Sequence, residues 1–187
     1  KKLLLKGKKL KYCSDCGSSK IKFVTPEGDH VKRYICSECE NIFYTNPNMV
    51  VGALCVRGEK ILMAKRNIHP RKGMWTLPAG FMENAETLQQ GALRETFEET
   101  GSHAKVIQPY TLFSLPHINQ VHMFFLADLL DENFGPTSES QLVELHGEDE
   151  ILWDELAFPT VEKTLRHYFS DKQKGEYIFR EENITLW

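Results

Sequence analysis

The sequence has no long hydrophobic run and no strong excess of charge of either sign. The apolar stretch Leu3–Leu5 is far shorter than the roughly 20 residues that a membrane-spanning helix needs, and no small-residue cleavage site follows it. The formal net charge of −3 over 187 residues provides no general attraction to nucleic acid. These absences favour a soluble protein with no membrane partner, and they argue against a nucleic-acid partner.

Internal repeats, low-complexity tracts and long linkers are also absent. Apolar residues at 41% and charged residues at 26% are usual for a soluble globular protein. The length fits one ordinary domain with a small appendage. Six lysines fall among the first eleven residues, and we interpret this segment as a solvated arm rather than a nucleic-acid or membrane tether.

The spacing of the cysteines predicts a metal site. Two C-x-x-C pairs, separated by 19 residues, are formed by Cys13, Cys16, Cys36 and Cys39. Closely paired thiols, an odd cysteine total and the lack of a signal-peptide pattern favour a metal over disulfides and a reducing compartment, for which the cytoplasm fits best. Four thiolates close a tetrahedral zinc site and leave no position for water, so the predicted Zn²⁺ is structural. Free or redox-active thiols and an iron site are the alternatives. The fifth cysteine, Cys55, lies in an apolar run and is predicted to be buried.

The segment from Tyr12 to Thr45 is predicted to be a small unit around that metal. Two β segments, Lys20–Thr25 and Val31–Ile35, flank a turn signal at Pro26-Glu27-Gly28-Asp29. A unit of this size rarely folds on a hydrophobic core alone. The breaker Asn46-Pro47-Asn48 marks the boundary, so we expect residues 1–46 to form the arm and metal unit and residues 47–187 the main domain.

The main body is predicted to be mixed α/β. A helix over Glu86–Thr100 ends at Gly101, which favours a left-handed cap, and a second helix covers Thr160–Phe169. No element is assigned to the last 15 or so residues. The strands are expected at Met49–Val56, Ile61–Lys65, Trp75–Leu77, Val106–Leu115, Val121–Leu129 and within Ser138–His146.

The first of these helices carries a cluster of acids. Glu95, Glu98 and Glu99 are spaced i, i+3, i+4 and so share one face, with Leu93 and Phe97 opposite, where we expect them to enter the core. Like charges at this spacing, and anions at a helix C-terminus, each destabilise the helix by roughly 0.2–1 kcal/mol. A divalent cation reverses both penalties, and carboxylate oxygens suit Mg²⁺ or Mn²⁺.

Arg94 is spaced to pair with Glu98 at i+4, and Glu86 lies at the predicted helix start. Glu86 has two equal interpretations, a favourable N-terminal charge or a member of the acidic network. Together these positions resemble the Nudix box. Its seven fixed glycine and polar positions are present at the right intervals as Gly80, Glu86, Arg94, Glu95, Glu98, Glu99 and Gly101. Thr96 and Ser102 depart from it, because those positions are usually aliphatic.

The resemblance extends over nearly the whole chain. The cysteine unit and the segments NPNMVVGALC, KRNIHPRKGMWTLPAGF and LAFPT are similar to a zinc-ribbon Nudix group that includes plant plastid FAD/ADP-ribose pyrophosphatases. It implies an α/β/α sandwich with a mixed sheet. It further implies that Glu95 and Glu99 bind the metal, with Glu98 and the carbonyl of Ala79 as further ligands. A later loop carboxylate completes such sites; Glu139 matches best, Glu144 is the second choice, and an ordinary surface acid is the alternative.

The resemblance also implies a hydrolase that cleaves the diphosphate of a nucleoside diphosphate derivative. Bacterial NADH pyrophosphatases carry an SQPWPFP-type segment after the box, which this sequence lacks, whereas Pro116 is placed as in ADP-ribose pyrophosphatases. We therefore favour ADP-ribose or FAD, with release of AMP, over NADH. Glu98 or Glu139 would serve as the base.

Substrate contacts and assembly are less constrained. Lys65 and Arg66 could hold phosphate or lie in solvent, and Trp75 and Phe81 could stack on a base, although a strand Trp is more often core. His69, His117 and His122 do not have the spacing of metal ligands.

A different class of function is a non-catalytic nucleotide sensor or a nucleic-acid-binding module built on the cysteine unit. ADP-ribose-cleaving relatives are commonly dimers, so a homodimer is one option that the sequence does not decide.

Overall fold

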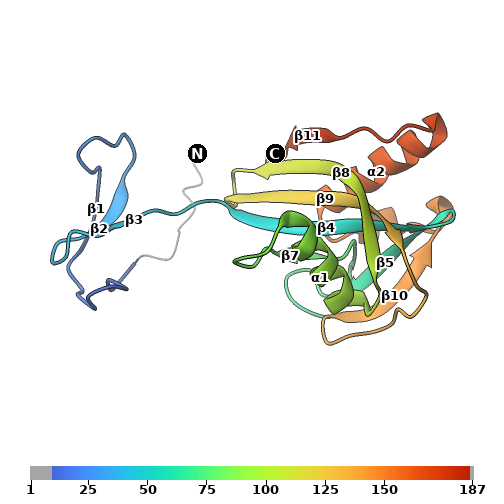
Figure 1. Ribbon diagram of the computed structural model, residues 1–187, viewed down its shortest axis with the longest axis horizontal. Helices are drawn as coiled ribbons and strands as arrows, with labels where there is room; N and C mark the ends of the chain where they lie inside the picture. The colour runs from blue at the N-terminus through green and yellow to red at the C-terminus, as the bar shows by residue number, and fades with distance from the viewer. Residues whose placement is uncertain (1–9, 186–187) are drawn as a thin grey trace. The chain divides into compact units, whose positions relative to one another are not determined.

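The computed structural model describes residues 10–185, and most of the predicted basic arm lies outside them. The chain divides into two compact units between Pro47 and Asn48 (Figure 1). In the described part of the chain, no helix is both long and apolar enough to cross a membrane.

The first unit is a three-stranded antiparallel sheet. Its strands are β1 (Ile21–Val24), β2 (Arg33–Cys36) and β3 (Ile42–Phe43), in the order β1-β2-β3. The two predicted β segments correspond to β1 and β2, while β3 was not expected. Within the described part of this unit only Cys13 and Cys36 are fully buried. The unit therefore has almost no apolar core, so a cross-link through its cysteines would supply stability that burial does not.

The second unit is built on a mixed sheet. Strand order is β10-β5-β4-β9-β8-β11, with the short β6 beside β5 and β7 beside β4. The pairs β4/β9 and β8/β11 are parallel and the other pairs are antiparallel. The strands are β4 (Asn48–Arg57), β5 (Lys60–Arg66), β6 (Trp75–Thr76), β7 (Ala79–Phe81), β8 (Ala104–Leu115), β9 (Gln120–Leu129), β10 (Ser140–His146) and β11 (Arg180–Asn183).

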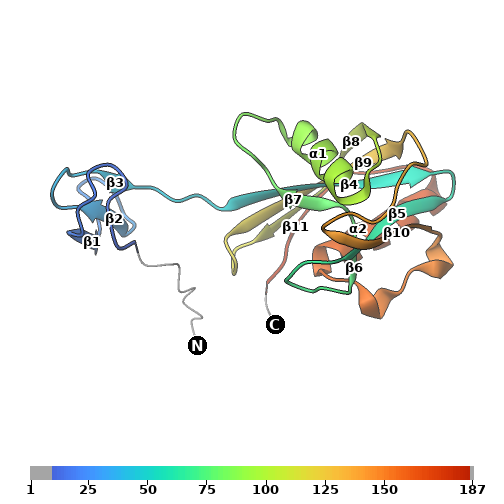
Figure 2. The same cartoon turned by 90° about the horizontal axis from the view of Figure 1, so that it is seen from below.

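Two helices cover opposite faces of this sheet (Figure 2). α1 (Leu88–Thr100) packs on one face, and α2 (Pro159–Lys174) packs on the other; two short 3-10 turns, Glu148–Glu150 and Trp153–Glu155, precede α2. The larger core cluster lies under α2 and contains Leu54, Phe113, Phe124, Val161 and Leu165. A smaller cluster under α1 contains Val51, Ala92, Met123 and Phe125. The predicted α/β/α sandwich with a mixed sheet is confirmed.

Helix α1 packs on the sheet through a different face from the one that the sequence predicted. Its buried residues are Gly91, Ala92, Glu95, Thr96, Glu99 and Thr100, so the acidic face points toward the sheet. Phe97, expected in the core, is 49% exposed and packs against His103 with ring centroids 4.8 Å apart. That expectation was wrong because small residues, not large apolar ones, let this helix approach the strands closely.

Both ends of α1 are capped by the residues that flank the helix. The Thr87 hydroxyl accepts a hydrogen bond from the backbone N–H of Gln90, and the Gln90 side-chain oxygen accepts one from the backbone N–H of Thr87. These two hydrogen bonds form a capping box. The helix therefore begins after Glu86 and not at it. Gly101 closes the helix with φ 75°, a left-handed conformation that glycine adopts without strain, as the sequence predicted.

The C-terminal segment, which the sequence left unassigned, forms β11. This strand pairs in parallel with the second half of β8. Asp171 at the end of α2 is fully buried and ion-paired to Arg180, and it also accepts hydrogen bonds from Tyr110 and from the backbone of Ile178. The carboxylate of Asp171 thus fastens β11 to the helix and the sheet.

Candidate active site and cysteine cluster

The acids of α1 lie against the backbone of β7. Residues of β7 pair with β4, and Gly80 faces α1. A Cβ at Gly80 would lie 2.5 Å from Oε1 of Glu95, closer than real atoms allow. Gly80 is therefore required because the Glu95 carboxylate occupies the space that any side chain would need.

Arg94 connects three acids of this region. Its Nε and Nη2 donate to the two carboxylate oxygens of Glu86, at 3.0 and 2.8 Å. Its Nη1 donates to Glu95 at 2.7 Å and to Glu98 at 3.0 Å, and Nη2 also donates to the carbonyl of Phe81 at 3.1 Å. The predicted pair with Glu98 is present. Of the two interpretations of Glu86, the network role agrees with this geometry.

Glu99 is the most deeply buried of the helix acids. Its Oε2 accepts a hydrogen bond from the backbone N–H of Ala79 at 3.1 Å. The pKa of Glu99 is raised to about 8, chiefly by burial and also by the nearby charge of Glu95, even though that hydrogen bond lowers it. Burial also raises the pKa of Glu95. Two partly desolvated carboxyls side by side are costly as anions unless a cation lies next to them.

A further acid and a basic group, both from other elements, act on Glu95 and Glu99. The charge of Glu139 raises the pKa of both Glu95 and Glu99, whereas Arg66 lowers the pKa of Glu99. The backbone of Glu139 is fixed by a 2.7 Å hydrogen bond from the N–H of Asn67. Glu144, the second choice in the sequence, bonds instead to His146 at 3.3 Å. Glu139 thus lies within electrostatic reach of Glu95 and Glu99.

The acids and Ala79 offer hard oxygen ligands of the kind that Mg²⁺ and Mn²⁺ prefer. In the described residues, only the cysteines gather three or more ligand atoms within metal-binding range. The acids do not, because Arg94 holds Glu95 and Glu98 toward itself and Ala79 holds Glu99. The donor set fits a divalent cation by its chemistry and by the burial of two of its anions.

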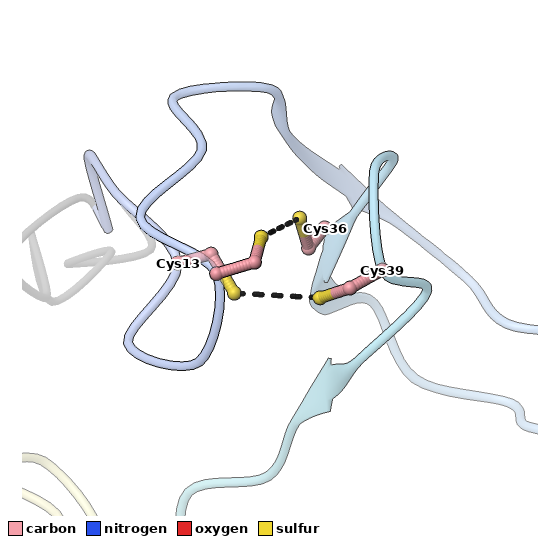
Figure 3. A group of neighbouring side chains, drawn as sticks. Cys13, Cys36 and Cys39 are labelled. Carbon is pink, nitrogen blue, oxygen red and sulfur yellow. Dashed lines mark hydrogen bonds between the residues drawn. The ribbon is translucent and has the colours of Figure 1, made fainter.

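The four cysteines of the first unit converge on one point, and Figure 3 labels three of them, Cys13, Cys36 and Cys39. All four Sγ atoms lie within 4.8 Å of one another, and the pairs Cys13–Cys39 and Cys16–Cys36 are both 3.6 Å apart. A tetrahedral zinc with bonds of about 2.3 Å places its sulfurs roughly 3.8 Å apart. The cluster therefore fits zinc. Cys55 is fully buried in the second unit, as predicted, and burial raises its pKa to about 12.

The predicted substrate-contact residues differ in exposure. Phe81 is 53% exposed and its carbonyl accepts from Arg94, whereas Trp75 is only 4% exposed and packs against His146. Trp75 thus has no free ring face for stacking. Arg66 is 8% exposed and lies over the ring of Phe158 at 5.1 Å. Phe158 was not expected at the site, although it belongs to the LAFPT segment.

Comparison with known proteins agrees with this geometry. The family model described as NUDIX domain matches residues 46–172, and the model described as Nudix N-terminal matches residues 11–45. A Nudix hydrolase structure from Nitrosomonas europaea is 45% identical, with a TM-score of 0.92, and the match covers 95% of this chain and all of that chain.

Among curated proteins, an "NAD-capped RNA hydrolase NudC" from Photobacterium profundum is 31% identical over 68% of this chain and 46% of its own length. An "ADP-ribose pyrophosphatase" from Methanocaldococcus jannaschii is 35% identical over 47% of this chain and 53% of its own length. This chain spans less than half the length of the NudC relatives it matches. Both family models, the sandwich fold and the box geometry agree: the chain belongs to the Nudix hydrolase family, in the form that carries an N-terminal zinc ribbon.

Proposed function

We propose that this protein is a metal-dependent pyrophosphatase that cleaves the diphosphate of ADP-ribose or FAD and releases AMP. The observation that carries the proposal is the pair of buried carboxyls, Glu95 and Glu99, with Glu98 and Glu139 close by. Such a concentration of negative charge at the end of a helix is destabilising unless it binds a cation. A diphosphate is the substrate group that such a cation would share.

The residues that would hold Mg²⁺ or Mn²⁺ are Glu95, Glu98, Glu99 and the carbonyl of Ala79. When bound, the ion supplies charge neutralisation of the diphosphate and a lowered pKa for water. Arg94 keeps Glu95 and Glu98 oriented. In the overall step a water oxygen forms a bond to one phosphorus, and the bond from that phosphorus to the bridging oxygen breaks.

The proton from the water passes to Glu98 or Glu139, the two candidates for the general base. General-base assistance of this kind is worth roughly 10²–10⁴-fold in rate. The products are AMP with ribose 5-phosphate from ADP-ribose, or AMP with FMN from FAD. Arg66, which lies within electrostatic reach of Glu99, is a candidate to bind a phosphate oxygen.

A second candidate substrate is NADH or the NAD cap of an RNA. It is favoured by the NudC relatives, whose printed name is that of a hydrolase of NAD-capped RNA. The absence of an SQPWPFP-type segment supports ADP-ribose or FAD instead. A nucleic-acid partner enters the proposal only through this second candidate.

The experiment is a substrate panel with the zinc-loaded full chain. ADP-ribose, FAD, NADH, NAD-capped RNA, ADP-glucose, diadenosine polyphosphates and dNTPs are incubated with Mg²⁺ or Mn²⁺, and in parallel with chelator. We expect AMP from ADP-ribose or FAD at the highest kcat/KM, and none with chelator. If well-folded protein turns over no member of the panel, the alternative of a nucleotide-sensing or nucleic-acid-binding module replaces this proposal.

The remaining parts of the proposal concern the zinc ion, the cellular location and the oligomeric state. We assign a structural role to zinc at the cysteine cluster. The paired thiols support a cytoplasmic location, because a reducing compartment keeps them available for metal. The resemblance to ADP-ribose pyrophosphatases supports a homodimer, and light scattering on the zinc-loaded chain tests it directly.

A further inference from the structure

The start of β9 and the end of β7 present polar and aromatic groups on one face of the sheet. Val50 of β4 pairs with Phe81 on one side and with His122 on the other. Paired residues on neighbouring strands point to the same face, so Phe81, Val50 and His122 form a row on the α2 face. Gln120 precedes His122 by two residues and lies on that face as well. None of the four is fully buried.

The backbone at the Phe81 end of this row contacts the candidate catalytic residues of α1. Phe81 is two residues beyond Ala79, whose N–H binds Glu99, and the carbonyl of Phe81 accepts from Arg94. With strands about 4.8 Å apart, the Cα atoms of Phe81 and His122 lie roughly 10 Å from each other. A flat ring placed on Phe81 would therefore have the β9 side chains at its edge.

His122 fixes the orientation of Gln120. Nε2 of His122 lies 2.8 Å from Oε1 of Gln120, and Nδ1 lies 3.4 Å from the hydroxyl of Thr160 at the start of α2. Burial lowers the pKa of His122 to about 4, so the ring is neutral at pH 7 and carries one proton. An amide oxygen only accepts, so that proton is on Nε2, and Nδ1 accepts from Thr160.

The amide of Gln120 is left with unused capacity. Across residues 10–185, its Nε2 has no hydrogen-bond partner, and Oε1 retains a second lone pair. A donor and an acceptor in one plane match the N6 and N7 atoms of adenine, the pairing by which Gln reads that base in nucleic acids. ADP-ribose, FAD and NADH all contain adenine, so one such site would serve each of them.

We propose that Phe81, Gln120 and His122 form an adenine subsite: the base stacks on Phe81, Gln120 reads its edge, and His122 positions Gln120. The inference rests on the proposed function in that the adenosine half of the substrate is placed beside the acid cluster. Phe81 and Gln120 touch the ligand. His122 acts through Gln120 and is a positioning residue.

The test measures binding and not turnover. AMP and IMP differ at the base edge that Gln120 would read, so calorimetry with each nucleotide and Mg²⁺ gives the ratio of their Kd values. A bidentate amide contact is worth about 1–3 kcal/mol of discrimination, equivalent to about a 5- to 150-fold preference for AMP in the wild type. In Gln120→Ala we expect the ratio to fall close to one. In Phe81→Leu both nucleotides should weaken together, with the ratio unchanged.

Two further variants separate positioning from folding. His122→Ala should lose the AMP preference, and His122→Gln should restore it, because the Gln amide again donates to Gln120; a purely structural role for His122 would not produce this split. Gln173→Ala, on an exposed part of α2, is the control and should match the wild type. Thermal melting confirms that each variant is folded.

Equal binding of AMP and IMP by the wild type, no binding of either nucleotide, or a preference that survives Gln120→Ala would overturn the subsite. These outcomes are independent of the substrate panel. A protein that hydrolyses ADP-ribose yet binds AMP and IMP equally refutes the subsite alone. A protein that hydrolyses nothing yet shows the Gln120-dependent preference refutes the enzyme alone.

Discussion

Arg94 holds Glu86 in a two-point hydrogen bond, with Nε and Nη2 at 3.0 and 2.8 Å from the two carboxylate oxygens. These hydrogen bonds lower the pKa of Glu86 to about 2, so the pair is ionised throughout the neutral range. Because Glu86 precedes the helix and Arg94 lies within it, the pair ties the loop before α1 to the acids that follow.

Replacing Arg94 with Lys should impair catalysis more than folding. A lysine has one nitrogen and cannot contact Glu86, Glu95 and Glu98 together. Misplacement of catalytic groups by about 1 Å can cost roughly 10²-fold in rate, and we expect a loss in kcat of that order. Steady-state kinetics on the best panel substrate measure it. Arg166→Lys, which changes an exposed pair with Glu162, should leave kcat at the wild-type value; equal losses in both variants would contradict the role of Arg94.

Replacing Gly80 with Ala tests the close approach of Glu95. The added methyl group would lie 2.5 Å from Glu95 Oε1, so the carboxylate or β7 must move. We expect a loss of kcat of roughly 10²-fold or more. Gly135→Ala is the matched control, because its added atom meets nothing within 4 Å. Wild-type kcat in Gly80→Ala would show that the position of Glu95 is not critical.

Glu99→Gln should separate chemistry from stability. The amide keeps the volume and the hydrogen-bond acceptor for Ala79, and it removes a buried carboxyl whose burial raises its pKa to about 8. The melting temperature should stay the same or rise, while kcat falls by orders of magnitude and added Mg²⁺ no longer stabilises the protein. Unfolding of this variant would instead identify Glu99 as a structural residue.

Zinc removal should affect the first unit selectively. Changing Cys13, Cys16, Cys36 and Cys39 to Ser should abolish about one equivalent of zinc per chain, because these thiols are the only assembled ligand set in the described residues. Hydrogen exchange should become fast in residues 10–47 and stay slow in the strands of the second unit. Cys55→Ala should retain the metal. A zinc-free wild-type protein of normal stability would contradict the assignment.

Asp171→Asn should loosen β11. Burial by itself would raise the pKa of Asp171, but hydrogen bonds from Arg180, Ile178 and Tyr110 outweigh it and hold the pKa at about 2. Its stabilisation is therefore complete above the unfolded pKa near 3.8 and is lost as the pH falls toward 2. Breaking one side of a buried ion pair costs about 3–5 kcal/mol. Denaturant melts should show that deficit at pH 7 and a smaller one at pH 3; an equal deficit at both would contradict the ionised pair.

Periodicity and turn signals predicted most elements of the fold. The helix before Gly101 and the strands around Val106–Leu115 and Val121–Leu129 agree with α1, β8 and β9 to within two residues. These segments have strong patterns and clear stop signals. β11 was missed because its residues, Arg180–Asn183, are polar. Its place in the sheet depends on the tertiary contact with Asp171, which no local pattern reports.

The composition of the candidate site was predictable, but its packing was not. The box identified the acids, yet the helix wheel placed Phe97 in the core because it treats large apolar residues as the buried face. In the structure the small residues Gly91 and Ala92 are buried against the sheet, and Phe97 is exposed. The link from Gln120 through His122 to Thr160 joins β9 to α2 across 38 residues of sequence, and spacing along the chain carries no signal for it.

The narrow contact between α1 and the sheet also bears on how relatives could diverge. Gly91 has no room for a Cβ, since it would meet Glu86 at 2.6 Å and Val51 at 2.8 Å. A helix fixed this tightly has little freedom to slide or turn, and its acids are set relative to β7. New substrate preferences are thus expected to arise in the loops and strand ends that surround the helix, where changes can accumulate without moving the reactive groups.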